Sequence, residues 1–372
     1  MKVCFFIPSL GDGGAQRQCI ALLNVLQRQP DLEIHLVLLG RGEHEAELDT
    51  AQLSIHRIDI NNFADPRALI FILTVLVRVR ADVLISWLRP ADIWAYAASR
   101  LLPRVAWVMT ERNSFYPDEL IFNLRKSVGR RGPAAIVANS EGGRKLWQSL
   151  SPKPPIRVIP NMVIRPHATL PPREGTRDPD LLYVGRLEPQ KNIALMLDIF
   201  AKFASISADG RLVIAGKGSL SSRVEPWAEQ YGISQRVRLL GFRQDVQTLM
   251  AKARVFLSFS VHEGMPNTVM EAITAGVPAV VSDIPEHRAL LGDDYPYFVD
   301  LNAPPAEAAE TVMRAWAESK NSSRSTLRHA NEVLATMTPE HIANSYIELF
   351  KEVIGTKRPR SNAQMKRPRQ RP

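Results

Sequence analysis

Short apolar runs rich in β-branched residues recur along the whole chain, separated by segments of helix length. In the first half they occupy residues 2–8, 34–39, 82–87, 105–110, 134–139 and 156–160, and in the second half residues 181–187, 211–216, 236–242, 253–259 and 277–283. Strands that alternate with helices are typical of βαβ units, which build parallel sheets. The pattern predicts an α/β protein with two doubly wound domains, which suits a chain of 372 residues.

A charged stretch at residues 165–180 separates the two sets of runs, with four prolines and little hydrophobic pattern. Such a stretch marks a domain boundary. We therefore predict an N-terminal domain over residues 1–165, a linker over 166–180 and a C-terminal domain over 181–337. Residues 338–355 should form a last helix that packs back toward the N-terminal domain, with Thr338 as its N-cap and Pro339 at its first position.

The formal net charge of +9 is concentrated at the end of the chain. Residues 356–372 contain seven Lys or Arg and no acid, so the other 355 residues carry a net charge of only +2. A short basic tail with three prolines and no apolar periodicity is predicted to be disordered. It either keeps the protein soluble or is attracted to anionic lipid headgroups, and we do not expect nucleic acid as a partner.

Composition also bears on the compartment. Two cysteines, Cys4 and Cys19, are too few for a disulfide framework in so long a chain, which favours a reducing cytoplasm. The apolar run at residues 68–77 is shorter than the ~18–20 residues of a membrane helix and predicts a buried helix instead. The N-terminus runs directly into a glycine turn, so we interpret it as a strand and not as a signal peptide.

The most informative motif is HEGMPNTVMEA at residues 262–272. Pro266 fits the first turn of a helix, and Gly264 would let the backbone approach a ligand. A helix N-terminus binds anions such as phosphate, while Glu263 and Glu271 on either side could accept hydrogen bonds from hydroxyl groups. A phosphate between hydroxyl-rich groups describes a nucleotide sugar. Alternatively, Glu263 caps a turn and Glu271 is a solvated helix residue.

A pair of cations follows the first strand of the second domain, in GRLEPQKN at residues 185–192. Arg186 and Lys191 lie in a turn, and a helix should begin near Asn192. Arg can bind a phosphate through two hydrogen bonds and Lys acts as a point charge, so together they could neutralise a diphosphate. The alternative is an unremarkable surface pair.

The first turn of the chain, SLGDGGAQRQ at residues 9–18, is only superficially a dinucleotide-binding sequence. Gln16 occupies the place of the third small residue, and Gly40 and Arg41 stand where an acid is expected, which disfavours NAD binding. Gly13 and Gly14 could still let this loop approach a phosphate at a helix start, or they form a plain tight turn. Three elements spread over two domains indicate a ligand in the cleft between them.

Together, EGMPNTVMEA, GRLEPQKN and GGAQR resemble the retaining glycosyltransferases of family 4, over nearly the whole chain to about residue 354. The resemblance implies a type B fold, in which two Rossmann-like parallel-sheet domains face each other across a cleft and the C-terminal domain binds the donor, such as a UDP-sugar. By position, Arg186 and Lys191 would bind the diphosphate and Glu271 the ribose. The sugar would be contacted by Glu263 and the backbone of Gly264, Met265, Pro266 and Asn267.

The same resemblance implies that residues 216–218 and 239–246 contact the nucleotide. It also implies transfer with retention at the anomeric carbon, in which a donor phosphate oxygen takes the acceptor proton. Neither a metal nor a cofactor is expected. The protein would then act mainly by positioning and charge stabilisation.

One loop departs from the family pattern. Many relatives carry a histidine in the loop after the fourth strand, whereas TERNSF at residues 110–115 places Arg112 there, beside Glu111. Similar forms are found in bacterial enzymes that add N-acetylhexosamines to lipid-linked glycans. Glu111 and Arg112 would contact the donor sugar or the acceptor; alternatively, they form a structural ion pair.

The acceptor side is less specified. Arg125, Lys126, Arg130 and Arg131 would suit an anionic membrane surface or a diphosphate-linked lipid, and a solvated helix face is an equal alternative. Trp87 and Trp94 are predicted to be core or cleft-wall residues rather than a sugar platform.

The leading hypothesis is a cytoplasmic, peripherally membrane-associated glycosyltransferase of bacterial surface polysaccharide, lipopolysaccharide or glycolipid synthesis. It would transfer a hexose or N-acetylhexosamine from a nucleotide sugar to a glycan or lipid-linked acceptor. A sugar-nucleotide epimerase of the same fold and a non-catalytic binding module are the alternatives.

Overall fold

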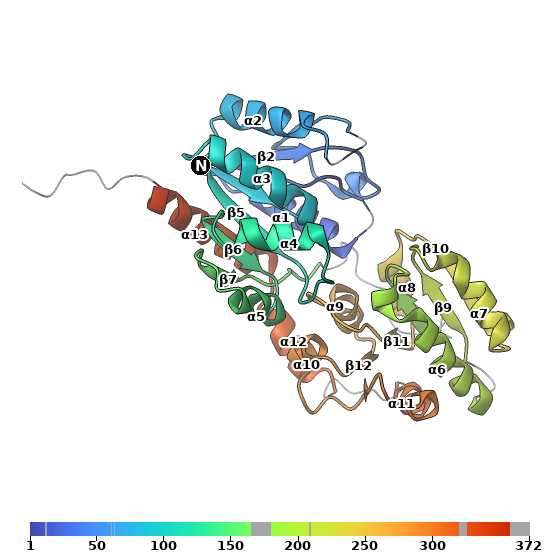
Figure 1. The fold of residues 1–372 in the computed structure, drawn as a ribbon. Coiled ribbons are helices and arrows are strands. Elements are labelled where there is room, and N and C mark those ends of the chain that lie inside the picture. Colours follow the sequence, from blue (N-terminus) through green and yellow to red (C-terminus); the bar gives the residue numbers. More distant parts are fainter. Residues whose placement is uncertain are drawn as a thin grey trace, which may run out of the picture.

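The computed structural model describes residues 1–11, 13–60, 62, 64–164, 180–207, 210–319 and 326–357. Two α/β domains lie side by side, each built on one parallel sheet (Figure 1). The predicted linker lies outside the described residues except for Asp180, and so does the basic tail from residue 358 onward.

The N-terminal sheet has seven parallel strands in the order β3-β2-β1-β4-β5-β6-β7. Alternate residues of β1 face opposite sides: Val3 and Phe5 belong to one core cluster, and Cys4 and Phe6 to the other. The strand order reverses between β1 and β4, which is where doubly wound sheets bind ligands. The strands are β1 (Lys2–Phe6), β2 (Glu33–Leu38), β3 (Leu53–Arg57), β4 (Val83–Ser86), β5 (Ala106–Glu111), β6 (Ala135–Ala138) and β7 (Ile156–Val158).

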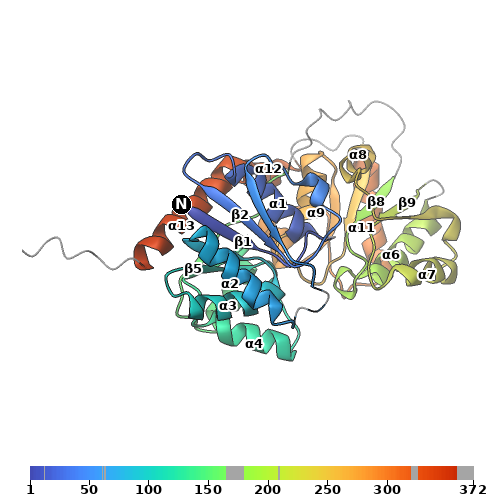
Figure 2. The ribbon, with the colours of Figure 1, turned by 90° about the horizontal axis from the view of Figure 1, so that it is seen from above.

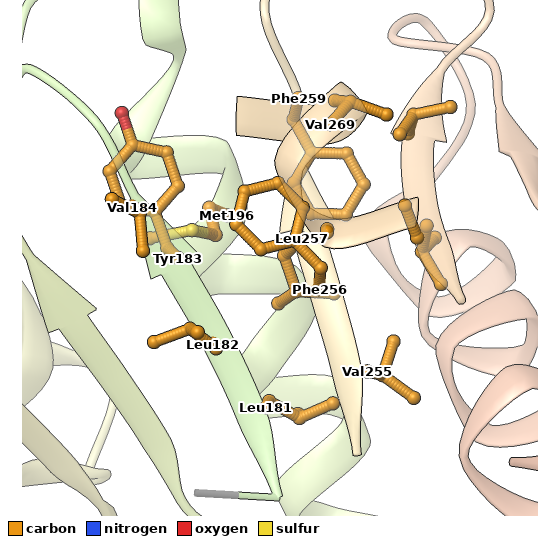
Figure 3. Close-up of a cluster of buried hydrophobic side chains, with 14 of the residues drawn as sticks. Leu181, Leu182, Tyr183, Val184, Met196, Val255, Phe256, Leu257, Phe259 and Val269 are labelled. Carbon is orange, nitrogen blue, oxygen red and sulfur yellow. The ribbon is translucent and has the colours of Figure 1, made fainter. Parts of the chain in front are cut away.

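The C-terminal sheet has six parallel strands in the order β10-β9-β8-β11-β12-β13. Its order reverses between β8 and β11, which pair with Leu181 opposite Val255; their buried side chains, among them Tyr183 and Leu257, belong to the core shown in Figure 3. The strands are β8 (Leu181–Val184), β9 (Leu212–Ala215), β10 (Val237–Gly241), β11 (Val255–Ser258), β12 (Ala279–Ser282) and β13 (Phe298–Val299).

Two strands were not predicted. Residues of β3 are mostly exposed or half-buried because β3 lies at a sheet edge, so no apolar run marks it. The strand β13 is only two residues long. Both are edge strands, which need less apolar sequence than central ones.

Helices cover both faces of each sheet (Figures 1 and 2). The N-terminal domain contributes α1 (Gly14–Leu26), α2 (Arg67–Val79), α3 (Arg89–Leu101), α4 (Leu120–Gly129) and α5 (Glu141–Ser149). The second half contributes α6 (Ile193–Ile206), α7 (Val224–Gln230), α8 (Val246–Lys252), α9 (Asn267–Thr274), α10 (Pro285–Leu291), α11 (Pro305–Glu318), α12 (Arg328–Ala335) and α13 (Pro339–Lys357). Short 3₁₀ turns are η1 (Glu45–Glu47), η2 (Pro189–Lys191), η3 (Ser221–Arg223) and η4 (Ser234–Arg236).

The apolar run at residues 68–77 forms α2, but this helix is buried on one face only. Ile72 and Leu76 face the core, whereas Ile70 is 65% exposed and Val77 60% exposed. The predicted helix is therefore present, but the prediction that it is buried holds for one face only. An all-apolar run hides helical periodicity, so the sequence gives no sign of the exposed face.

The last helix returns to the first domain. α13 follows Thr338, whose hydroxyl accepts a hydrogen bond from the His341 N–H at 3.2 Å, and it continues to Lys357, beyond the predicted end at residue 355. Tyr346 and Phe350 are buried in the N-terminal core, where the Phe350 ring meets the Phe5 ring edge-on at 6.4 Å. Figure 2 shows α13 beside the start of the chain.

The Phe350→Ala substitution tests whether α13 is an integral part of that core. Removing the fully buried ring should lower the free energy of unfolding by ~3–5 kcal/mol, because it leaves a cavity. Glu348→Ala, on the exposed face of the same helix, should change it by less than ~0.5 kcal/mol. Urea unfolding of both variants measures the difference; equal, small effects would show that α13 is a peripheral attachment.

Candidate functional site

A polar cavity of about 370 Å³ lies in the cleft between the two domains, where the carboxyl ends of the central strands meet. Both domains contribute to its wall. The residues that carry its chemistry are Gly13, Gly14, Arg112, Asn113, Asn139, Asn161, Arg186, Lys191, Glu263, Gly264, Met265 and Asn267. The structure thus brings nine of the twelve predicted site residues into one cavity wall; Pro266, Glu271 and Glu111 are not part of it.

The helix start predicted in EGMPN is present with a shift of one residue. Helix α9 begins at Asn267, and Pro266 is its N-cap, not its first helical residue. The expectation for Pro266 is corrected accordingly, although the N-terminus of α9 still faces the polar cavity. The partial positive charge of this terminus favours an anion there.

Lys191 and Glu263 form the central ion pair of the cavity. Their Nζ and Oε1 atoms are 2.5 Å apart, and the two side chains are only 17% and 10% exposed. Burial alone would raise the pKa of Glu263, but the Lys191 ammonium outweighs it and holds this pKa below its usual range. Glu263 is therefore ionised, and Lys191 keeps further N–H donors for a ligand.

Backbone contacts fix the turn that carries the cations. The Tyr183 hydroxyl donates to the Arg186 carbonyl at 2.9 Å, and the Arg186 side chain is exposed at the cavity wall. A Cβ on Gly216 would lie 1.9 Å from the Gly185 carbonyl oxygen, so only glycine permits this contact. The Gly216 N–H donates to Gly241 at 2.8 Å, which links the loops after β8, β9 and β10.

The two domains touch directly at the glycines of the motifs. A Cβ on Gly264 would lie 2.0 Å from the Arg112 carbonyl oxygen, and a Cβ on Gly14 would lie 2.7 Å from the Asn267 Nδ2 atom. The Ser114 hydroxyl also donates to the Glu263 carbonyl at 2.5 Å. Gly264 was expected to let the backbone approach a ligand; in this structure it lets the backbone of the N-terminal domain approach at Arg112.

A smaller side cavity of about 100 Å³ continues from the polar cavity and shares Gly14, Arg186 and Asn267 with it. Its wall includes Glu271 and residues 242–244 of the loop after β10, which are part of the segment 239–246 expected to contact a nucleotide. Glu271 is not a solvated helix residue, because its side chain is only 10% exposed and pairs with Arg17 at 3.1 Å.

A third cavity of about 590 Å³ lies between α5, α10 and α12 and shares Gly264 and Met265 with the polar cavity. It is larger but mostly apolar, with a wall that includes Pro160, Leu290 and Met337. We place the chemistry in the polar cavity, because the cation pair and the helix terminus lie there.

Family comparisons agree with this geometry. Residues 12–164 match the model of Glycosyltransferase Family 4, and residues 171–331 match the model of Glycosyl transferases group 1. The chain belongs to the type B glycosyltransferases.

Individual relatives of this glycosyltransferase act on bacterial glycans. It is 28% identical over 320 residues to the N-acetylgalactosamine-N,N'-diacetylbacillosaminyl-diphospho-undecaprenol 4-alpha-N-acetylgalactosaminyltransferase of Campylobacter jejuni, covering 79% of this chain and 84% of the relative. It is 25% identical over 276 residues to the lipopolysaccharide core biosynthesis glycosyltransferase LpsE of Rhizobium meliloti, covering 72% and 75% of the two chains.

Among solved structures, HepE of Anabaena in complex with UDP and glucose matches with a TM-score of 0.79 at 16% identity, over 94% of this chain and 99% of that one. WaaG, a glycosyltransferase involved in lipopolysaccharide biosynthesis, matches with a TM-score of 0.74 at 15% identity, over 94% and 99% of the two chains. Both confirm the predicted two-domain type B fold.

The structure separates Glu111 from Arg112, which were expected to act together. Arg112 reaches the polar cavity: its guanidinium stacks 3.5 Å from the Trp87 ring centroid and donates to Asn161 at 3.0 Å and to the Tyr346 hydroxyl at 2.8 Å. Trp87 itself is only 1% exposed and belongs to the N-terminal core, which is one of the two places predicted for it. The alternative of an ion pair between Glu111 and Arg112 does not hold in the glycosyltransferase.

Glu111 is fully buried, and protein groups occupy both its oxygens. Oε2 accepts from Arg125 at 2.6 Å and from the Trp147 indole at 2.8 Å, while Oε1 accepts from Tyr116 and from two backbone N–H groups. The predicted contact with a sugar is therefore corrected, and we assign Glu111 the role of holding the cavity wall.

Arg125 does not belong to a surface cluster either. It is buried between Glu111 and Asp92, at 2.6 Å from each. Burial raises the pKa of Asp92 to about 6, against the opposing effect of Arg125. Of the four basic residues suggested for a membrane contact, Arg130 and Arg131 are exposed and Lys126 is half-buried.

Sequence reasoning missed Arg17 and Asn161 as site residues. Arg17 was visible in GGAQR, four residues after Gly13 and so on the first turn of the helix. Asn161 follows β7 and links Arg112 to Asn267, whose Oδ1 accepts from the Asn161 amide at 2.7 Å. A polar residue directly after a parallel strand was the signal that could have found it.

Within the described ranges, no three His, Cys, Asp or Glu side chains gather into a metal-binding group. None of the helices there is both long and apolar enough to cross a membrane. The expectation of a metal-independent enzyme stays a prediction.

The Glu111→Gln substitution distinguishes a structural role from a ligand contact. It should lower the free energy of unfolding by ~3–5 kcal/mol, because it leaves buried Arg125 without one of its two carboxylates. Glu119→Gln, at an exposed position before α4, is the control and should have little effect. Thermal and urea unfolding measure the change. Unchanged stability with lost sugar binding would contradict the structural role.

Proposed function

We propose that this glycosyltransferase moves a hexose or N-acetylhexosamine from a nucleotide diphosphate sugar to a glycan or lipid-linked acceptor, with retention at the anomeric carbon. The observation that carries the proposal is the Lys191–Glu263 ion pair near the N-terminus of α9, beside Arg186 in the interdomain cleft. It places two cations and a helix N-terminus around a space that opens toward an ionised carboxylate.

The charge layout fits the departure of a nucleoside diphosphate. Negative charge grows on the diphosphate as the bond to the sugar breaks, and Arg186, Lys191 and the amides of α9 would stabilise it. Glu263 would accept hydrogen bonds from sugar hydroxyls and orient the ring. The neighbouring side cavity, with Phe242 and Glu271, would take the nucleoside.

The hydrogen bond from Lys191 to Glu263 supports a mechanism with retention. The Glu263 Oε1 atom is held by Lys191, so the carboxylate is an oriented hydrogen-bond acceptor and not a free nucleophile. In the proposed step, the acceptor oxygen attacks the anomeric carbon on the face that the leaving phosphate departs from. The acceptor proton passes to the departing phosphate oxygen, so no other base is needed.

The acceptor class rests on the relatives. The Campylobacter jejuni enzyme is named for adding N-acetylgalactosamine to a diphospho-undecaprenol glycan, and LpsE for lipopolysaccharide core biosynthesis. We propose that this chain likewise acts in bacterial surface polysaccharide, lipopolysaccharide or glycolipid synthesis.

A donor screen with two variants tests the proposal. Wild type should bind a nucleotide diphosphate sugar and transfer its sugar to polyprenyl-diphosphate glycans, without added metal. Lys191→Ala and Glu263→Ala should each lower kcat/KM by ~100-fold or more, because each removes a charge that the transition state needs. Lys202→Ala, an exposed lysine on α6, is the matched control. Absence of binding to every nucleotide sugar would refute the function.

Proton NMR of the same reactions determines the anomeric configuration of the product and distinguishes a transferase from an epimerase or a non-catalytic module. Retention predicts the same anomeric configuration in donor and product, and inversion would overturn the mechanism. A change in the donor sugar without any acceptor would indicate an epimerase. Binding without turnover over a broad acceptor panel would indicate a non-catalytic module.

We further propose that α4 contacts the membrane that carries the acceptor. Its outer surface exposes Leu120 (87%), Ile121 (45%) and Leu124 (45%), and Phe115 in the preceding loop is 53% exposed. Exposed Arg130 and Arg131 follow at its C-terminal end. Apolar side chains next to basic ones suit the interface of an anionic bilayer.

Vesicle cosedimentation of a Leu120→Ser and Leu124→Ser double variant tests this contact. Binding to phosphatidylglycerol-containing vesicles should fall ~10-fold or more, because two apolar side chains no longer enter the interface. Ile206→Ser, at an apolar position in the other domain that is 60% exposed, should bind as wild type does. Equal binding of all three proteins would exclude α4 as the contact.

A further inference from the structure

Arg17 belongs to the N-terminal domain but reaches the ribose-side carboxylate of the C-terminal domain. It lies on the first turn of α1, where its N–H donates to the Gly13 carbonyl at 3.1 Å. Its Nη1 atom is 3.1 Å from the Glu271 Oε1 atom, and its side chain is only 21% exposed. The ion pair therefore spans the cleft at the wall of the side cavity.

Neighbouring residues of the N-terminal domain hold Arg17 in this position. Its Nε atom donates to the Glu47 carboxylate at 3.4 Å, and the other Glu47 oxygen lies 2.7 Å from the His44 Nδ1 atom. The His44 ring in turn packs edge-on against Phe242, with centroids 5.6 Å apart. Arg17 is thus the middle of a chain that connects both walls of the side cavity.

The two oxygens of Glu271 have different surroundings. Oε1 is bound by Arg17, whereas Oε2 is buried and has no hydrogen-bond partner among the residues that the structure describes. Burial raises the pKa of Glu271, and the Arg17 guanidinium opposes that effect. A buried carboxylate oxygen without a donor is costly, so it is suited to a ligand that brings a hydroxyl group.

The positive charge of Arg17 is already neutralised by carboxylates, so Arg17 is poorly suited to bind a phosphate. It lies between the carboxylates of Glu47 and Glu271, so this cluster holds one guanidinium and two acids. Lys191, by contrast, lines the polar cavity, and Arg186 lies in the wall that the two cavities share. The arrangement around Arg17 is one that orients a carboxylate, not one that attracts an anion.

We propose that Arg17 is a positioning residue for ribose recognition: by fixing one oxygen of Glu271, it directs the other toward a ribose hydroxyl of the donor. Arg17 and Glu271 belong to different domains, so the recognition geometry exists only while the cleft is closed. The proposal rests on the proposed function, since it assigns the nucleoside to the side cavity.

Nucleotide pairs that differ by one hydroxyl group test the proposal. UDP, GDP and ADP are first screened by calorimetry, and the tightest binder is compared with its 2′-deoxy and 3′-deoxy forms. Wild type should prefer the ribonucleotide over at least one deoxy form by ~10-fold or more. In Arg17→Gln that preference should fall to within ~2–3-fold, because Glu271 loses its fixed orientation.

Further variants separate orientation from charge. Glu271→Gln should show the same loss of preference, and the Arg17→Gln and Glu271→Gln double variant should lose no more than either single one. Arg17→Lys keeps the charge but not the planar fork, so it should keep part of the affinity and lose most of the preference. Arg28→Gln, an exposed arginine just after α1, is the control, and melting temperatures verify that each protein folds.

Two results would overturn the proposal. An equal loss of affinity for ribo- and deoxynucleotides in Arg17→Gln would make Arg17 a phosphate-attracting cation. An unchanged preference would remove Arg17 from recognition, while nucleotide binding by wild type would leave the proposed function intact. If wild type binds none of the three nucleotides and no nucleotide sugar, the proposed function itself fails.

Discussion

The closeness of the two domains at Gly264 is the constraint on which the site depends. No side chain fits there, because a Cβ would lie 2.0 Å from the Arg112 carbonyl oxygen. This contact brings the N-terminus of α9 against the first domain, so that Asn161 meets Asn267 and Arg17 meets Glu271. Each half alone supplies part of a binding wall, and only their apposition makes a site that encloses a ligand.

The fold could be predicted where its elements carry their own signal. Central strands such as β1 and β11 are buried on both faces and appear as continuous apolar runs, and Thr338 with Pro339 marks the start of α13. The edge strands β3 and β13 have no such run. The exposed face of α2 also escaped prediction, because Ile70 and Val77 have the same apolar character as its core residues.

The site was predictable only in the parts that follow local rules. A glycine turn, a cation pair and a helix start led to Gly14, Lys191 and Glu263, which lie together in the polar cavity. Which groups pair with one another could not be read in this way. Glu111 binds Arg125, fourteen residues away in sequence, and Glu271 binds Arg17 across 254 residues. Such pairs depend on how whole elements pack, which residue spacing does not encode.

The return of α13 has a consequence for how the chain is made. The N-terminal core contains β1 at one end of the sequence and Tyr346 and Phe350 near the other. A ribosome-bound chain therefore cannot complete this core until α13 has emerged, whereas the strands of the C-terminal sheet, β8 to β13, all emerge before α13. The domain synthesised first would be the last to reach its final stability, and until then its unfilled core would be exposed to chaperones and proteases.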